Sequence, residues 1–177
     1  MRMDVRRVNR LVSMLFEEWK DLSDEGRDLP IRWNVMHMFS SSQLAKVLAM
    51  RRGLDPELAA IAAALHDIAV VVTKRTEGHA QAAERHVRDA IATYNNGPWT
   101  TLPKVTKEEE DALVNAIVQH SDKETATGNP LVELLKDVDS LDRYLHGVKT
   151  EGAYLERLTR VLTELSIEPK QSSSEGS

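Results

Sequence analysis

The residues with the most evident chemistry in this sequence are a histidine and an aspartate that follow one another inside an apolar stretch. His66 and Asp67 stand in ELAAIAAALHDIAVVV, which is apolar on every face and therefore predicts a buried helix. Burying an imidazole and an ionised carboxylate is costly unless both are satisfied, and coordination of a cation satisfies them. A hydrogen-bonded core histidine beside an aspartate at a helix end is the alternative. Adjacent side chains project about 100° apart, so both reach one ion only near the end of that helix.

Further histidines lie on other expected helices. His37 precedes the apolar stretch, His79 opens the helix that follows it, and His120 closes a later one. These positions suit metal ligands or proton donors, although a surface or capping role is the alternative for His79 and His120. We expect His86 and His146 to lie on solvated faces and assign them no role.

Three aspartates, Asp137, Asp139 and Asp142, form a separate group on the sixth expected helix. All three border or enter the apolar stripe of that helix, so the helical period alone does not choose among them. The chain has no cysteine, which excludes disulfides, thiolate nucleophiles and iron–sulfur clusters. Any metal is therefore bound by nitrogen and oxygen.

The elements that must position these residues are helices, because apolar residues recur at intervals of three and four and no stretch alternates as a strand does. Helix starts are marked by Asp55–Pro56, by the capping box of Thr106 and Glu109, and by Asn129–Pro130. The sequence thus predicts an all-α chain. Its expected helices cover residues 5–22, 35–52, 56–68, 79–95, 107–121, 130–146 and 151–166, and its expected loops cover 23–33, 69–78 and 95–105.

The 177 residues suit one domain, which we place at residues 1–167. The serine-rich segment 168–177 has no apolar anchor and is expected to be disordered. A net charge of -5 disfavours nucleic acid and anionic membranes as partners. No apolar run approaches the roughly 18–20 residues of a membrane span, and acidic residues interrupt the first helix where a leader would be apolar. We expect a cytoplasmic protein, and exposed apolar positions on the first and last helices leave room for a homodimer.

The order of these residues resembles the HD superfamily of metal-dependent phosphohydrolases, in which a lone histidine, a His-Asp pair and a distant aspartate bind metal on a helical bundle. The resemblance covers residues 36–145. His37 takes the first position and His66–Asp67 the pair. The segment KDVDSLDRY resembles the family's Asp-Ala-Asp-x-Leu-Asp, whose middle aspartate binds metal, and this implies Asp139 as the fourth ligand.

The resemblance implies a single-domain helical bundle of the HD type with about six or seven helices. Two positions depart from the common pattern, Ala69 where many members have glycine and Val138 in place of alanine, and neither removes a ligand. Some members use further histidines for a second metal or for phosphate, at the places of His79 and His120. Lys74 and Lys123 are further candidates for phosphate or a second metal site.

The implied activity is hydrolysis of a phosphate ester, from a small phosphorylated metabolite or a nucleotide. Its cofactor is a divalent ion, Mn, Fe, Co, Ni or Mg, or a pair of ions, that activates water. Asp67 would bind the ion and orient the water, and His79 or His120 would supply a proton. Two alternatives keep the metal: a di-iron oxygenase of the same fold, or a non-catalytic regulatory module that binds metal or nucleotide.

Overall fold

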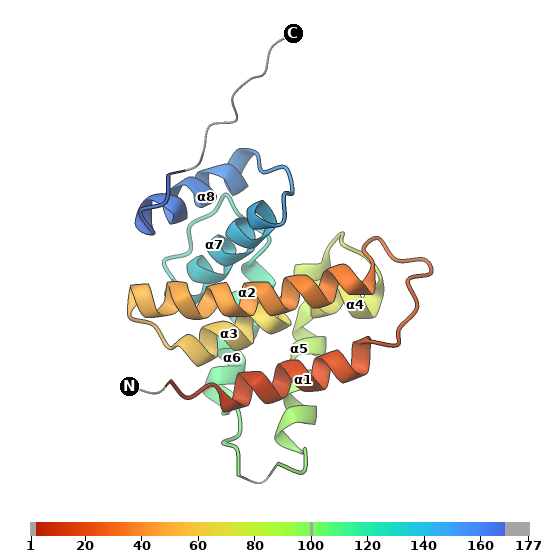
Figure 1. Cartoon of the computed structure of the whole chain (residues 1–177). Helices are drawn as coiled ribbons and strands as arrows, with labels where there is room; N and C mark the ends of the chain where they lie inside the picture. The colour runs from red at the N-terminus through yellow and green to blue at the C-terminus, as the bar shows by residue number, and fades with distance from the viewer. Residues whose placement is uncertain (1–2, 100, 169–177) are drawn as a thin grey trace.

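The computed structural model describes residues 3–99 and 101–168, which form eight helices and no strand (Figure 1). The all-helical prediction is confirmed. The expected disordered segment 168–177 lies outside the described residues except for Glu168. In chain order the helices are α1 (Arg6–Trp19), α2 (Ile31–Arg52), α3 (Pro56–Leu65), α4 (Ile68–Thr73), α5 (His79–Asn95), α6 (Lys107–Gln119), α7 (Pro130–Leu145) and α8 (Gly152–Glu164).

Helices α2 and α3 form the centre of the molecule. Figure 1 shows α1 on one side of this pair and α7 with α8 on the other. Helices α5 and α6 pack against one another, and α6 also contacts α3 and α7. One continuous cluster of buried apolar side chains draws on all eight helices, so the helices that carry the candidate site residues share a core.

The predicted helix starts are confirmed at three places. The Asp55 carboxylate accepts hydrogen bonds from the amides of Glu57 and Leu58 at the start of α3. Thr106 and Glu109 form the capping box of α6, and Asn129 caps α7. Each side chain satisfies backbone donors that the first turn of a helix leaves unpaired.

The main departure from prediction lies at the His-Asp pair. Helix α3 ends at Leu65 instead of residue 68, the chain turns at His66 and Asp67, and α4 occupies part of the expected loop 69–78. The backbone of Asp67 has φ -102° and ψ 14°, outside the helical region. Because Ile68 and the three residues after it are buried, the chain resumes a helix that packs into the core. This extra helix raises the number from the expected six or seven to eight.

The segment before α2 is shorter than predicted. Helix α2 begins at Ile31 instead of residue 35, directly after Pro30. The Ile31 amide donates to the Asp24 carboxylate at 2.7 Å, and the Ile31 side chain is buried. The predicted loop 23–33 is therefore too long at its C-terminal end, because it includes the start of α2.

One segment among the described residues, Pro56–Thr73, is long and apolar enough by itself to cross a membrane. This differs from the expectation that no apolar run approaches the length of a membrane span, since the 18-residue window has a mean hydropathy of 1.5. It is 72% buried inside the bundle, and the chain turns within it. Length and composition are weak grounds for a membrane span, because core helices pass the same test.

Replacing Asp55 by alanine tests the cap of α3. Loss of both hydrogen bonds should lower the free energy of unfolding by ~1 kcal/mol, measured by urea denaturation. The matched control is Asp21→Ala, an exposed carboxylate for which no hydrogen bond is found among the described residues. Equal stability of the two variants would contradict the capping role.

Candidate metal centre

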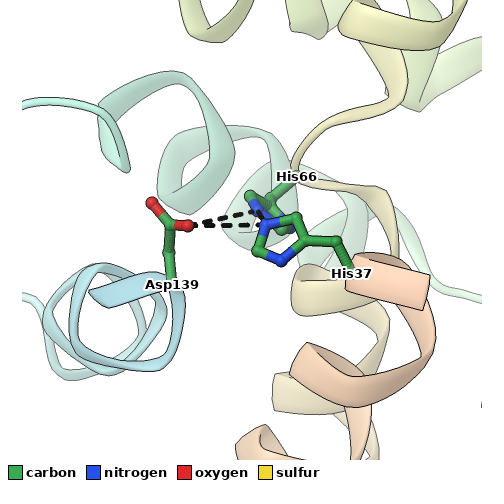
Figure 2. A group of neighbouring side chains, drawn as sticks. All are labelled: His37, His66 and Asp139. Carbon is green, nitrogen blue, oxygen red and sulfur yellow. Dashed lines mark hydrogen bonds and ion pairs between the residues drawn. The ribbon is translucent and has the colours of Figure 1, made fainter. Parts of the chain in front are cut away.

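Three buried side chains from distant parts of the chain converge on one point. His37 of α2, His66 after α3 and Asp139 of α7 are each less than a tenth exposed (Figure 2). The Nε2 atoms of His37 and His66 are 3.0 Å apart, and Asp139 Oδ1 lies 3.4 Å and 4.0 Å from them. Asp67 Oδ2 lies 3.5 Å and 3.6 Å from the same two nitrogens. Two imidazole nitrogens and two carboxylate oxygens thus share one small space.

The other ring nitrogen of each of these histidines, Nδ1, is already hydrogen-bonded. His66 Nδ1 donates to the carbonyl of Ala63 at 2.7 Å, and His37 Nδ1 donates to the Asp142 carboxylate. A carbonyl or ionised carboxylate only accepts, so the hydrogen of each neutral ring is on Nδ1. Each Nε2 then presents a lone pair to the shared space, the arrangement that a metal-binding histidine requires.

Two lone pairs 3.0 Å apart beside two carboxylates need a cation between them. Burial by itself lowers the pKa of His37, but Asp139 and Asp142 outweigh it and raise the pKa to about 10. Burial lowers the pKa of His66 to about 4. In the metal-free protein the space thus holds one proton on His37, and a divalent ion would take its place. This mixed nitrogen and oxygen donor set fits such an ion.

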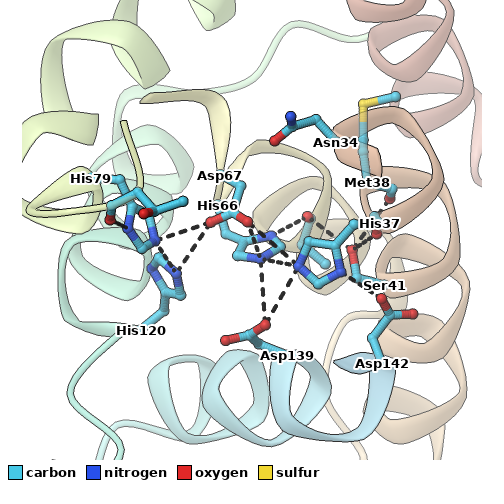
Figure 3. Close-up of polar contacts among 12 residues, drawn as sticks. Asn34, His37, Met38, Ser41, His66, Asp67, His79, His120, Asp139 and Asp142 are labelled. Atoms are coloured by element: carbon cyan, nitrogen blue, oxygen red, sulfur yellow. Dashed lines mark hydrogen bonds and ion pairs between the residues drawn. The ribbon is translucent and has the colours of Figure 1, made fainter. Parts of the chain in front are cut away.

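A second cluster shares Asp67 with the first. Asp67 Oδ1 lies 3.0 Å from His79 Nε2 and 3.6 Å from His120 Nε2, and the two nitrogens are 3.1 Å apart (Figure 3). His79 Nδ1 donates to the carbonyl of Thr76 and His120 Nδ1 to that of Ile117, each at 2.6 Å. Asp67 therefore faces one cluster with each oxygen, the geometry of a carboxylate that bridges two metal ions.

The ends of helices bring these residues together. His79 is the first residue of α5, His120 follows the last residue of α6, and His66 follows the last residue of α3. At the turn after α3 the chain changes direction between His66 and Asp67, so the two side chains do not follow the 100° spacing of one helix. Both thereby reach the same small space.

The structure gives the three aspartates of α7 different partners. Asp139 faces His37 and His66. Asp137 forms ion pairs with Arg52 and Arg157 on the other side of the helix. Asp142 binds the Nδ1 edge of His37. Of the three aspartates, Asp139 is thus the one that lies beside both His37 and His66.

The two candidate lysines have different places. Lys123 is buried, and its Nζ donates to Asp139 Oδ2 and to the carbonyl of His120, each at 2.6 Å. Burial lowers the pKa of Lys123. Lys74 is exposed and donates to the carbonyl of Glu25, so the structure does not bring it to the clusters. Its backbone is left-handed, with φ 66°, where the chain leaves α4, and its side chain contacts the segment before α2.

Sequence reasoning missed the residues behind His37. His146 is only 20% exposed, contrary to the expected solvated face, and its Nε2 lies 3.0 Å from Ser40 Oγ and 3.5 Å from Asp142 Oδ2. The Trp33 ring stacks on His37 with centroids 6.0 Å apart. The spacing of Asp139, Asp142 and His146, at i, i+3 and i+7, is the signal that would have placed them on one helix face.

Asn34 is a further buried residue near the first cluster. Its Nδ2 donates to the carbonyls of Pro30 and Leu29, while its Oδ1 is buried without a partner among the described residues. Figure 3 shows the side chain above His37 in this view. An acceptor at this place can receive a hydrogen bond from water or substrate.

Comparison with known families bears directly on this geometry. A family model described as HD domain matches residues 34–145, a range that contains both clusters and more than half of the chain. The chain belongs to the HD domain family. Searches of curated proteins and of solved structures found no match. In an HD domain, the buried His and Asp groups are consistent with a divalent metal site.

The protonation of His37 predicts how metal affinity depends on pH. A divalent ion must displace the proton that His37 holds below a pKa of about 10, so apparent affinity should rise by about tenfold per pH unit between pH 7 and pH 9. Competition with a chelator of known pH dependence measures this for Mn²⁺. An affinity that stays constant over this range would contradict the proton displacement.

Asp142 should support the metal site without touching the metal. In Asp142→Asn the amide still accepts from His37 Nδ1, but the lost charge makes Nε2 a weaker ligand, and Mn²⁺ affinity should fall about 10–100-fold. Asp21→Asn, which removes an exposed charge, serves as the control. Unchanged affinity in Asp142→Asn, with a melting temperature like that of the parent protein, would show that Asp142 has no such role.

Proposed function

We propose that this protein is a metal-dependent hydrolase of phosphate esters, with a small phosphorylated metabolite or a nucleotide as substrate. The observation that carries the proposal is the meeting of His37, His66, Asp67 and Asp139 at one point in a chain of the HD domain family. The chemistry supplied by a divalent ion there, Mn, Fe, Co, Ni or Mg, is Lewis acidity toward a phosphoryl oxygen and a water of lowered pKa.

Asp67 has the central role among the residues of the chain. Burial raises the pKa of its carboxyl, but the neighbouring histidines His66, His79 and His120 outweigh burial and hold the pKa well below its usual range. Asp67 is therefore ionised at neutral pH. With one oxygen in each cluster, it can bind metal and accept a hydrogen bond from the attacking water, which fixes the direction of attack on phosphorus.

His79 is the proton donor that we propose for the leaving group. Burial lowers its pKa, but the hydrogen bond and charge of Asp67 outweigh burial and raise the pKa above the usual value. His79 is thus protonated over a wider pH range than a free histidine. Its side chain is 19% exposed, so a substrate can reach it, whereas His120 beside it is buried.

The second cluster also favours a second candidate function. Asp67 Oδ1, His79 and His120 lie close enough to one another to hold a second ion, and a pair of iron ions held there would supply oxygen activation. In that case the protein purified and loaded with iron under anaerobic conditions binds two irons and changes its absorbance on exposure to air. Hydrolysis with Mn²⁺ or Mg²⁺ and no such change would favour the phosphohydrolase.

Activity measurements on generic phosphomonoesters and phosphodiesters test the proposed function. Protein purified without chelator and supplied with Mn²⁺, Co²⁺ or Mg²⁺ should hydrolyse at least one class, and Asp67→Asn should reduce this to background because both clusters lose a ligand. Asp21→Asn is the control. Activity that survives either a chelator or Asp67→Asn would exclude the proposed mechanism, and absence of turnover with all substrates would favour the regulatory module.

Replacing His79 separates proton donation from metal binding. If His79 donates a proton, His79→Gln should lower kcat by about 10²-fold and leave the metal content unchanged. If His79 holds a second ion, the metal content of the variant should fall from two equivalents to one. Full activity of His79→Gln with unchanged metal content would contradict both roles.

A further inference from the structure

In the part of the chain that the structure describes, an arginine without an acidic partner lies about one helical turn from Asp139 of α7. Arg143 follows Asp139 by four residues, so the two side chains share a face of the helix. Arg143 is only partly exposed. No ion pair or side-chain hydrogen bond of its guanidinium is found among the residues that the structure describes. Its guanidinium carbon lies 5.1 Å from the centroid of the Tyr154 ring.

Tyr154 links this arginine to the metal centre. Lys123 Nζ lies 5.0 Å from the centroid of the same ring and donates to Asp139 Oδ2 at 2.6 Å. Burial raises the pKa of Tyr154 to about 12, and the charges of Asp139 and Asp67 contribute. The phenol is therefore protonated at neutral pH, and no acceptor for its hydroxyl is found among the described residues. It is an available hydrogen-bond donor close to the centre.

Other arginines buried near α7 have acidic partners. Arg157 pairs with Asp137 and Glu133 at 2.9 and 3.0 Å, and Arg52 pairs with Asp137 and Glu164. Arg143 differs in combining partial burial with no carboxylate of its own. A guanidinium in this state can form charge-assisted, bidentate hydrogen bonds with an anion that enters from outside the chain.

We propose that Arg143, together with the Tyr154 hydroxyl, binds a second phosphate of the substrate. This inference rests on the proposed function, because the reacting phosphate must lie at the metal centre. Asp139 and Arg143 are four residues apart, about 6 Å of rise along the helix, so the second phosphate lies a short distance beyond the first. The substrate class is then a molecule with two nearby phosphates, such as a nucleoside polyphosphate or a bisphosphate, and not a lone monoester.

Binding of two matched phosphonates to the metal-loaded protein tests the inference without turnover. The probes are propylphosphonate, with one anionic group, and 1,3-propanediphosphonate, with two; calorimetry gives each dissociation constant, after correction for binding of the probe to free metal. Arg143→Gln should raise the dissociation constant of the diphosphonate about tenfold, the scale of one charge-assisted hydrogen bond. It should change that of propylphosphonate less than twofold.

Further variants separate a specific contact from a change of overall charge or stability. Arg143→Lys keeps the charge and should recover part of the diphosphonate affinity, and Tyr154→Phe keeps the ring and should lose about threefold. The control Arg85→Gln removes an arginine whose side chain is 87% exposed and pairs with Asp89, and it should change neither probe. If Arg143→Gln does not fold, Tyr154→Phe and Arg143→Lys decide the question.

Equal weakening of both probes by Arg143→Gln, or no change in either, overturns the inference. If Arg143→Gln does not fold, the inference is overturned when Tyr154→Phe and Arg143→Lys both bind the diphosphonate with the dissociation constant of the parent protein. Failure of the proposed function has a different signature: propylphosphonate binding that does not depend on added metal, or hydrolysis that persists in Asp67→Asn. The ratio of the two dissociation constants thus tests Arg143, and metal dependence tests the centre.

Discussion

Two pairs of histidine Nε2 atoms face one another across a very small buried space, and this arrangement constrains the rest of the molecule. In each of two histidine pairs, the Nδ1 edges donate to fixed acceptors, which directs the Nε2 atoms toward one another at 3.0 and 3.1 Å. Such a contact is repulsive unless a proton or a metal ion lies between the nitrogens. The bundle must hold it in place against that repulsion, and it does so with Asp142 behind His37 and backbone carbonyls behind the other three histidines. A proton or a cation between the paired nitrogens relieves this repulsion.

The surrounding residues compensate the charges of the two histidine pairs. Asp139 shares its carboxylate between the histidines and Lys123, so that neither the buried lysine nor the buried aspartate lacks a partner. Asp142 supports His37 from behind, and Asp67 joins the two clusters. A buried network of this kind is stable only when every member is satisfied. Loss of one ligand should therefore affect the geometry of the others, so single substitutions need both metal content and activity as readouts.

Much of the fold was predictable from local sequence signals. Side chains that cap helices act on backbone groups only a few residues away, so Asp55, Thr106 and Asn129 located three helix starts. The turn at His66–Asp67 was not predictable, because the apolar run continues through the pair and only tertiary packing decides where α3 ends. The ligand set came from the resemblance to the HD superfamily, since periodicity did not choose Asp139. Contacts made across the bundle, such as His146 with Ser40 and Lys74 with Glu25, depend on helix packing that no local pattern encodes.

Anomalous X-ray scattering from crystals of the protein loaded with Co²⁺ tests the central claim most directly, because it locates the ion without relying on activity. A difference map at the cobalt edge should place a peak about 2.1 Å from the Nε2 atoms of His37 and His66, with Asp67 and Asp139 completing the ligands. A second peak beside His79 and His120 would identify a two-metal centre. A map with no peak between His37 and His66, at a cobalt concentration that saturates the protein in solution, would contradict the account.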